Sequence, residues 1–146
     1  MTTRETADIL ASHGLRPTQQ RLAVYEFLLC HPVHPTADTI YQSITQAYPT
    51  FSRTTIYNSL HALLDAGLIR TLNICAEEQR FDGNPIDHGH FRCTRCNGIF
   101  DFPLETESLK HQFPPGFTAD TTDVFAVGLC AACQRDAQSC SQPLLL

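Results

Sequence analysis

Apolar residues recur every three or four positions through the first half of the chain, which is the spacing of amphipathic helices. The pattern predicts four helices, which lie within the segments ETADILASHG, RPTQQRLAVYEFLLCHP, HPTADTIYQSITQAYP and FSRTTIYNSLHALLDAGLI. Thr18, Thr36 and Ser52 stand where a side-chain oxygen can cap the first turn of the last three helices. Gly14 and Gly67 stand just after a helix end, where glycine is favoured.

The apolar faces of these helices, and the two segments after them, indicate how the first half folds. We expect the helices to bury Leu22, Val24, Tyr25, Leu28 and Leu29, then Ile40, Ile44 and Ala47, and finally Ile56, Leu60, Leu63 and Leu64. Two strand-like segments, LIRTLNI and EEQRFDG, follow and are joined by a short polar connection. Helices closed by a β-hairpin are the layout of a winged helix-turn-helix domain. The alternative is a small helical domain whose apolar faces only build a core.

The second half of the chain has a different pattern. Strand-like alternation or apolar runs occur in HFRC, GIFDF and FTADTTDVFAVGL. LETESLKHQF has a helical pattern and ends at the breaker Pro114-Pro115-Gly116, and AACQRDAQ predicts a short helix near the end. A unit of this size buries little core by itself, so it usually needs a metal or a partner subunit. The fold class we expect is therefore α+β.

The net charge of −5 is unevenly distributed, because basic and acidic side chains are equal in number up to residue 75. The whole deficit falls in residues 76–146, so composition alone argues against a nucleic-acid binder. A DNA-binding function must then rest on local geometry. No apolar run is long enough for a membrane span, and no export signal is evident. We expect a cytoplasmic protein whose seven cysteines are metal ligands or free thiols.

Two CxxC pairs, Cys93 with Cys96 and Cys130 with Cys133, form the first candidate site. Four thiolates complete the closed tetrahedral set that structural Zn²⁺ prefers. An iron–sulfur cluster is an alternative, and a redox dithiol would require a thioredoxin-like context that is absent here. The three remaining cysteines are isolated, and we expect none to be a ligand: Cys30 as a buried apolar residue, Cys140 as a surface thiol, and Cys75 without an assigned role.

A second candidate site is built from nitrogen and oxygen donors. His88 and His90 lie on the same side of an extended segment, since strand side chains repeat every two residues. With a carboxylate such as Asp101 they suit Fe²⁺, Mn²⁺ or Zn²⁺ rather than a thiophilic ion. His34 and Asp82 are further candidates, although spacing alone cannot place them at the same metal. A metallohydrolase that uses His88, His90 and a carboxylate with an activated water is the alternative of another class.

Several motifs in order, RPTQQR, HPTADTIY, SRTTIYNSLHALLDAGLI, RFDG, DHGHFRCTRC and GLCAAC, resemble the ferric uptake regulator (Fur) superfamily over about residues 8–136. This family consists of metal-dependent bacterial transcriptional repressors. The resemblance implies a winged-helix DNA-binding domain at 1–80, a hinge at 81–85 and a dimerisation and metal-binding domain at 86–146. It also implies a non-enzymatic homodimer that binds an AT-rich inverted repeat in double-stranded DNA, with no membrane association.

The resemblance also assigns the two sets of ligands. Structural zinc matches Cys93, Cys96, Cys130 and Cys133, and the regulatory Fe²⁺ or Mn²⁺ site matches His34, Asp82, His88, His90 and Asp101. Aspartate at both 82 and 101 resembles the peroxide-responsive repressor (PerR) branch, in which His34 and His88 would be the oxidised residues. Iron-, zinc- and manganese-responsive members remain alternatives. The extra regulatory site of some iron sensors is degraded, because its positions hold Gly89, Ser108 and Thr122, although Glu105 and Glu107 could substitute.

The helix that begins at Ser52 is the one we expect in the major groove of DNA. The residues that we expect to contact DNA are Ser52, Arg53, Thr54, Thr55 and Tyr57 from this helix, with Arg16 and Arg21 on phosphates. Without the family resemblance, these residues would be interpreted as an exposed helix face with no partner.

Overall fold

The structure is a computed structural model that describes residues 1–75 and 78–139. The chain divides into two compact units, Met1–Pro85 and Ile86–Leu146, and each is described by itself below. Among the described residues, no helix combines the length and the apolar character needed to cross a membrane.

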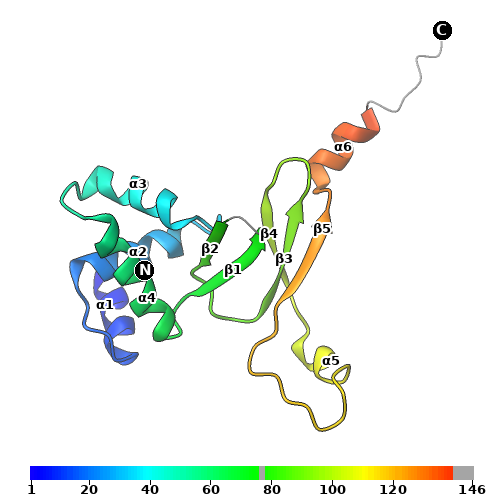
Figure 1. Ribbon diagram of the computed structural model, residues 1–146, viewed down its shortest axis with the longest axis horizontal. Helices are drawn as coiled ribbons and strands as arrows, with labels where there is room; N and C mark the ends of the chain where they lie inside the picture. Colours follow the sequence, from blue (N-terminus) through cyan, green and yellow to red (C-terminus); the bar gives the residue numbers. More distant parts are fainter. Residues whose placement is uncertain (76–77, 140–146) are drawn as a thin grey trace. The chain divides into compact units, whose positions relative to one another are not determined.

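The first unit consists of four helices followed by a hairpin (Figure 1). The helices are α1 (Thr3–Ser12), α2 (Gln19–Cys30), α3 (Ala37–Ala47) and α4 (Arg53–Asp65), and the antiparallel strands are β1 (Arg70–Cys75) and β2 (Glu78–Asp82). A bridge between Thr36 and Arg80, and a hydrogen bond from the Phe81 amide to the Pro35 carbonyl, attach the hairpin to the start of α3. This is the winged helix-turn-helix layout that the sequence predicts.

The helix ends confirm the predicted capping residues. The hydroxyls of Thr18, Thr36 and Ser52 each accept a hydrogen bond from the amide three residues on, at 3.3, 3.2 and 3.1 Å. Gly14 and Gly67 have φ angles of 75° and 72°, which glycine adopts without strain. Helix α1 begins earlier than expected, because Thr2 and Glu5 form a capping box.

The core of the first unit is made by the predicted apolar faces, with two corrections. Its fully or nearly fully buried members include Leu10, Val24, Leu28, Ile40, Ile44, Ile56, Leu60 and Leu63. Ala47 is exposed, because α3 ends there and Tyr48 packs against the core instead. Cys30 is also exposed rather than buried. It lies two positions beyond Leu28, which places it on the opposite side of α2.

The second unit is a three-stranded sheet with two short helices (Figure 1). Its elements are β3 (His88–Cys93), β4 (Ile99–Pro103), α5 (Thr106–Lys110), β5 (Val124–Gly128) and α6 (Ala131–Ser139). Strand β3 lies in the centre, antiparallel to β4 and parallel to β5. The strand expected over residues 117–129 begins only at Val124, because the polar segment before it lacks apolar alternation. The expected helix over 104–113 is reduced to α5.

Few side chains are buried in the second unit. Among its described residues, those below one-tenth exposure include Cys93, Cys133, His88 and His90, which are candidate metal ligands. Large apolar side chains are instead exposed, among them Phe100, Phe117, Phe125, Val127 and Leu129. A sheet with this distribution needs a metal or a partner surface to replace the missing core.

Candidate metal centres

The four cysteines of the CxxC pairs come together at one end of the three-stranded sheet. Cys93 ends β3 and Cys96 lies in the turn after it, while Cys130 precedes α6 and Cys133 lies in its first turn. Their four Sγ atoms all lie within 4.8 Å of one another, and the Cys96 and Cys130 sulfurs are 3.9 Å apart. A tetrahedral zinc ion with Zn–S bonds of about 2.3 Å requires sulfurs about 3.8 Å apart. The donor set therefore fits structural Zn²⁺.

Backbone amides around the cluster favour thiolates over thiols. The Cys130 amide donates to the Cys93 sulfur at 3.4 Å, and the Gly98 amide donates to the Cys96 sulfur at 3.4 Å. The hydrogen bond from Cys130 is the main reason why the pKa of Cys93 falls to about 6. A hydrogen bond with the Cys130 sulfur, which stabilises the protonated thiol, is the main reason why the pKa of Cys133 rises to about 12, and repulsion from a charge on Cys130 adds a smaller contribution. A divalent cation removes this repulsion.

The turn between β3 and β4 is shaped to hold Cys96. Asn97 has a φ angle of 57°, a left-handed conformation that asparagine tolerates better than most residues. A Cβ atom at Gly98 would lie 3.2 Å from the Cys96 sulfur and 3.0 Å from the ring of Phe100. Glycine at this position therefore lets the backbone amide approach the sulfur.

A group of nitrogen and oxygen donors occupies one face of the same sheet. His88 and His90 alternate along β3, and Asp101 lies opposite His90 on β4. The Nε2 atom of His88 is 3.6 Å from one Asp101 oxygen, and that of His90 is 3.4 Å from the other. Ligands of one cation with bonds of about 2.1 Å lie about 3.0–3.4 Å apart, so small movements complete the geometry. Both imidazoles are buried, whereas Asp101 is partly exposed.

The backbone around His88 fixes which nitrogen faces this group. The Nδ1 atom of His88 lies 2.5 Å from the carbonyl oxygen of Ile86, an acceptor that requires the proton to sit on Nδ1. The Nε2 lone pair is then directed toward Asp101 and is available to a metal.

The first unit carries a second pair of donors, His34 and Asp82. Both are buried, at 2% and 5% exposure, and His34 Nε2 lies 3.7 Å from an Asp82 oxygen. His34 adopts a φ angle of 53°, which is unusual for a residue other than glycine. Its carbonyl accepts a hydrogen bond from the Arg80 guanidinium at 3.1 Å, and the Asn84 amide donates to Asp82 at 2.9 Å.

The expected DNA-contacting residues all belong to the first unit. On α4, Arg53, Thr54 and Tyr57 are exposed, while the Ser52 hydroxyl caps the helix and also lies 2.8 Å from that of Thr55. The Arg21 guanidinium donates to the Arg16 carbonyl at 3.0 Å. That these side chains contact DNA stays a prediction.

Sequence reasoning missed Arg80, Asp38 and Tyr41, each of which contacts an expected site residue. For Arg80 a signal existed, because it alternates with Asp82 along β2. Of the isolated cysteines, Cys140 lies outside the described residues, and so does the side chain of Cys75.

Comparison with known proteins gives a consistent result. The family model of the Ferric uptake regulator family matches residues 12–123. The peroxide-responsive repressor PerR of Staphylococcus saprophyticus subsp. saprophyticus is 36% identical over 130 residues, which is 86% of each protein. The Campylobacter jejuni peroxide stress regulator has 26% identity and a TM-score of 0.67, covering 91% of this chain and 99% of its own. A zinc uptake regulator complexed with zinc and DNA has 25% identity and a TM-score of 0.70, covering 94% and 99%.

Proposed function

This chain belongs to the ferric uptake regulator family, and from that premise we propose that it is a metal-dependent transcriptional repressor that releases DNA when peroxide oxidises its own histidine ligands. The observation that carries the proposal is two groups of imidazole and carboxylate side chains, which are donors that suit Fe²⁺ or Mn²⁺. One group is His34 with Asp82, and the other is Asp101 with His88 and His90. The family consists of regulators rather than enzymes, so the metallohydrolase alternative is set aside.

The four-cysteine cluster would hold structural Zn²⁺. The cluster joins the turn after β3 to the start of α6. Many apolar side chains of the second unit are exposed rather than packed in a core, so they do little to hold these two segments together. Binding energies of about 10–16 kcal/mol, as in zinc-finger peptides, would be ample for this role.

The regulatory cation would be Fe²⁺ or Mn²⁺, and we assign it five ligands: His34, Asp82, His88, His90 and Asp101. Two of these belong to the first unit and three to the second. A cation bound by both groups fixes the orientation of the two units. Because it binds this closed arrangement better than an open one, it shifts the population toward the closed form.

In that closed form the α4 helices of a homodimer would enter successive major grooves of an AT-rich inverted repeat, about 34–36 Å apart or a multiple of it. Arg53, Thr54 and Tyr57 are exposed on α4 and so can reach base edges or phosphates. Arg16 and Arg21 are the proposed phosphate contacts. A DNA-bound regulator works in the cytoplasm, where we place this protein.

The partner surface of the homodimer is proposed to include β5. This strand lies at an edge of its sheet, and Phe125 and Val127 expose 43% and 55% of their surface. Edge strands with exposed apolar residues readily pair with another chain.

Peroxide sensing is favoured over metal sensing by the relatives named as peroxide-responsive and by the aspartates at 82 and 101. Fe²⁺, when bound, would supply the redox chemistry that cleaves the O–O bond of H₂O₂ beside its ligands, while over the whole reaction the histidine ring loses the two electrons that reduce the peroxide. The rings of His34 and His88 are the proposed targets. One peroxide oxygen is transferred to the imidazole C2 atom and the other leaves as water, which gives 2-oxo-histidine. The oxidised ring binds metal poorly, so the two units separate and DNA is released.

Mass spectrometry of peptides from the Fe²⁺-loaded protein tests this proposal. After stoichiometric H₂O₂, we expect one added oxygen atom on peptides containing His34 or His88, together with loss of DNA binding. The Mn²⁺-loaded protein is the matched control and should remain unmodified. Intact histidines and retained DNA binding in the iron form would contradict peroxide sensing and favour an iron-, zinc- or manganese-responsive regulator.

A further inference from the structure

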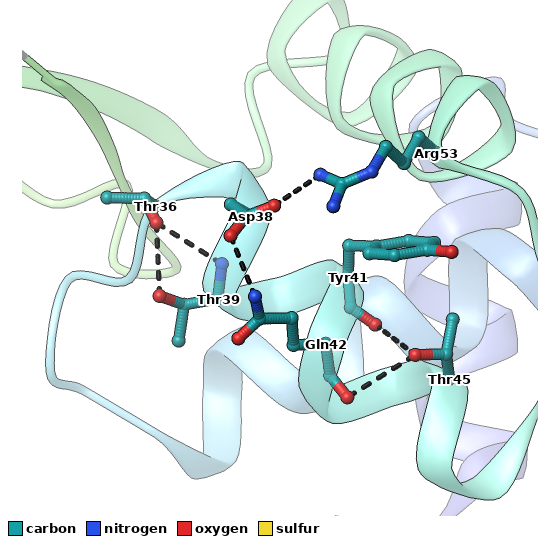
Figure 2. A network of polar contacts seen from close by, with 7 residues as sticks. All are labelled: Thr36, Asp38, Thr39, Tyr41, Gln42, Thr45 and Arg53. Atoms are coloured by element: carbon teal, nitrogen blue, oxygen red, sulfur yellow. Dashed lines mark hydrogen bonds and ion pairs between the residues drawn. The ribbon is translucent and has the colours of Figure 1, made fainter.

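Three side chains lie together where the first half of α3 faces the start of α4, and they hold one another in a defined arrangement (Figure 2). Asp38 lies in the first turn of α3, Tyr41 follows one turn later, and Arg53 is the first residue of α4. The Arg53 Nη1 atom donates to an Asp38 carboxylate oxygen, and the guanidinium carbon lies 4.5 Å from the centre of the Tyr41 ring. The other Asp38 oxygen accepts from the Gln42 amide at 2.9 Å.

This arrangement contributes little to the stability of the fold. The side chains of Arg53 and Asp38 are 56% and 50% exposed, and an exposed ion pair of this kind adds little to the free energy of unfolding. Its geometric effect is larger. A guanidinium that is hydrogen-bonded to a carboxylate and whose central carbon lies over an aromatic ring has few orientations left. The remaining N–H donors are therefore directed rather than mobile.

The charge of Asp38 argues against a phosphate as the target of Arg53. The carboxylate neutralises the guanidinium, and it would itself repel a phosphate near the start of α3. Residues at the N-terminal end of a recognition helix are the ones that reach base edges. Two parallel N–H donors on a planar guanidinium match the O6 and N7 acceptors of guanine.

We propose that Arg53 recognises a guanine in the major groove of the operator and that Asp38 and Tyr41 are the positioning residues that hold it for this contact. The inference rests on the proposed DNA-binding function. It makes Arg53 a specificity-determining residue, whereas the proposed contacts of Arg16 and Arg21 with phosphates provide affinity without sequence preference.

Selection from a random double-stranded DNA library, with the Mn²⁺-loaded full chain, supplies the operator. Binding is then measured over a range of salt concentrations, on that operator and on one in which a half-site guanine is replaced by 7-deazaguanine, which lacks the N7 acceptor. The variants are Arg53→Ala and Asp38→Asn. The controls are Gln46→Ala, at an exposed position of α3 outside this arrangement, and Arg16→Ala, which removes a proposed phosphate contact. Zinc content and circular dichroism check that each variant is folded.

We expect the wild type to prefer the guanine operator about tenfold. Arg53→Ala should lose this preference and bind both operators equally, and its salt dependence should flatten because Asp38 is then an uncompensated anion. Asp38→Asn should weaken the preference several-fold and steepen the slope of log affinity against log salt by about one for each protomer, since Arg53 is then an uncompensated cation. Gln46→Ala should match the wild type, and Arg16→Ala should bind both operators more weakly with a flatter slope.

The inference is overturned if Arg53→Ala keeps the wild-type preference for guanine over 7-deazaguanine, because Arg53 would then make no contact with the N7 atom. It is also overturned if Asp38→Asn behaves as the wild type. A wild-type protein that selects no DNA sequence removes the proposed function together with this inference. If the wild type selects a sequence motif, but Arg53→Ala changes the preference at none of its guanines, this inference fails and the proposed function stands.

Discussion

Gly89 separates the two histidines of β3 and leaves room for the ring of Phe102. A Cβ atom at this position would lie 2.2 Å from that ring, a distance at which the strand must shift. Alternation along the strand then directs His88 and His90 to the same face, where Asp101 meets both. At the scale of residues, glycine at position 89 is therefore what lets the Phe102 ring pack beside the two proposed histidine ligands.

Cys93 is fully buried within the four-cysteine cluster, and its sulfur accepts a hydrogen bond from the Cys130 amide. We expect Cys93→Ser to lose the bound zinc and to destabilise the second unit by several kcal/mol, of the order seen when structural metals are removed. Zinc released to a colorimetric chelator, together with thermal unfolding, measures both effects.

The matched control is Cys30→Ser, since Cys30 is exposed on α2. It should retain all of its zinc and unfold within about 0.5 kcal/mol of the wild type. A Cys93→Ser protein that still holds zinc as tightly as this control would contradict the four-cysteine assignment.

At the scale of elements, strand β2 holds the loop that carries His34. The Arg80 guanidinium binds the His34 carbonyl, and the Phe81 amide binds the carbonyl of Pro35. These bonds maintain the left-handed backbone at His34, a conformation that costs about 1–3 kcal/mol. The hairpin would thus support the proposed metal ligand His34 as well as complete the winged-helix fold.

Arg80→Ala should therefore weaken Mn²⁺ binding about tenfold or more, as outer contacts to metal ligands usually do, and leave zinc unchanged. Equilibrium titration of the zinc-loaded protein with Mn²⁺ measures the affinity. Gln79→Ala, an exposed neighbour on the same strand, is the control and should match the wild type. Equal affinities in the two variants would show that Arg80 has no positioning role.

The elements that depend on neighbours along the chain were the ones predictable from sequence. The caps at Thr18, Thr36 and Ser52 involve residues three apart, and the core faces follow the helical period. What the sequence could not supply depends on packing or on distant pairs. Arg53, for example, meets Asp38 only because α3 and α4 pack together. The exposure of Cys30, by contrast, follows from the helical period, and its burial was wrongly predicted from its apolar character. The cysteine cluster was predictable because Zn²⁺ imposes its own spacing on CxxC pairs.

At the scale of the whole molecule, the proposed dimer compensates for the weak core of the second unit. Val127→Glu places a charge on the exposed apolar side of β5 and should shift the protein from dimer to monomer, with loss of DNA binding. Analytical ultracentrifugation of the zinc-loaded protein measures the change. Thr121→Glu, at an exposed position before the strand, should remain dimeric. A Val127→Glu protein that is still dimeric would exclude this part of β5 from the interface.

The central claim is that one cation is bound by His34 and Asp82 of the first unit together with His88, His90 and Asp101 of the second. Titration of the zinc-loaded protein with Mn²⁺, followed by the electron paramagnetic resonance signal of the free ion, tests it most directly. The account predicts one tight Mn²⁺ per protomer, which is lost equally in His34→Ala and in His90→Ala. Two tight ions in the wild type, with each variant keeping one, would contradict it.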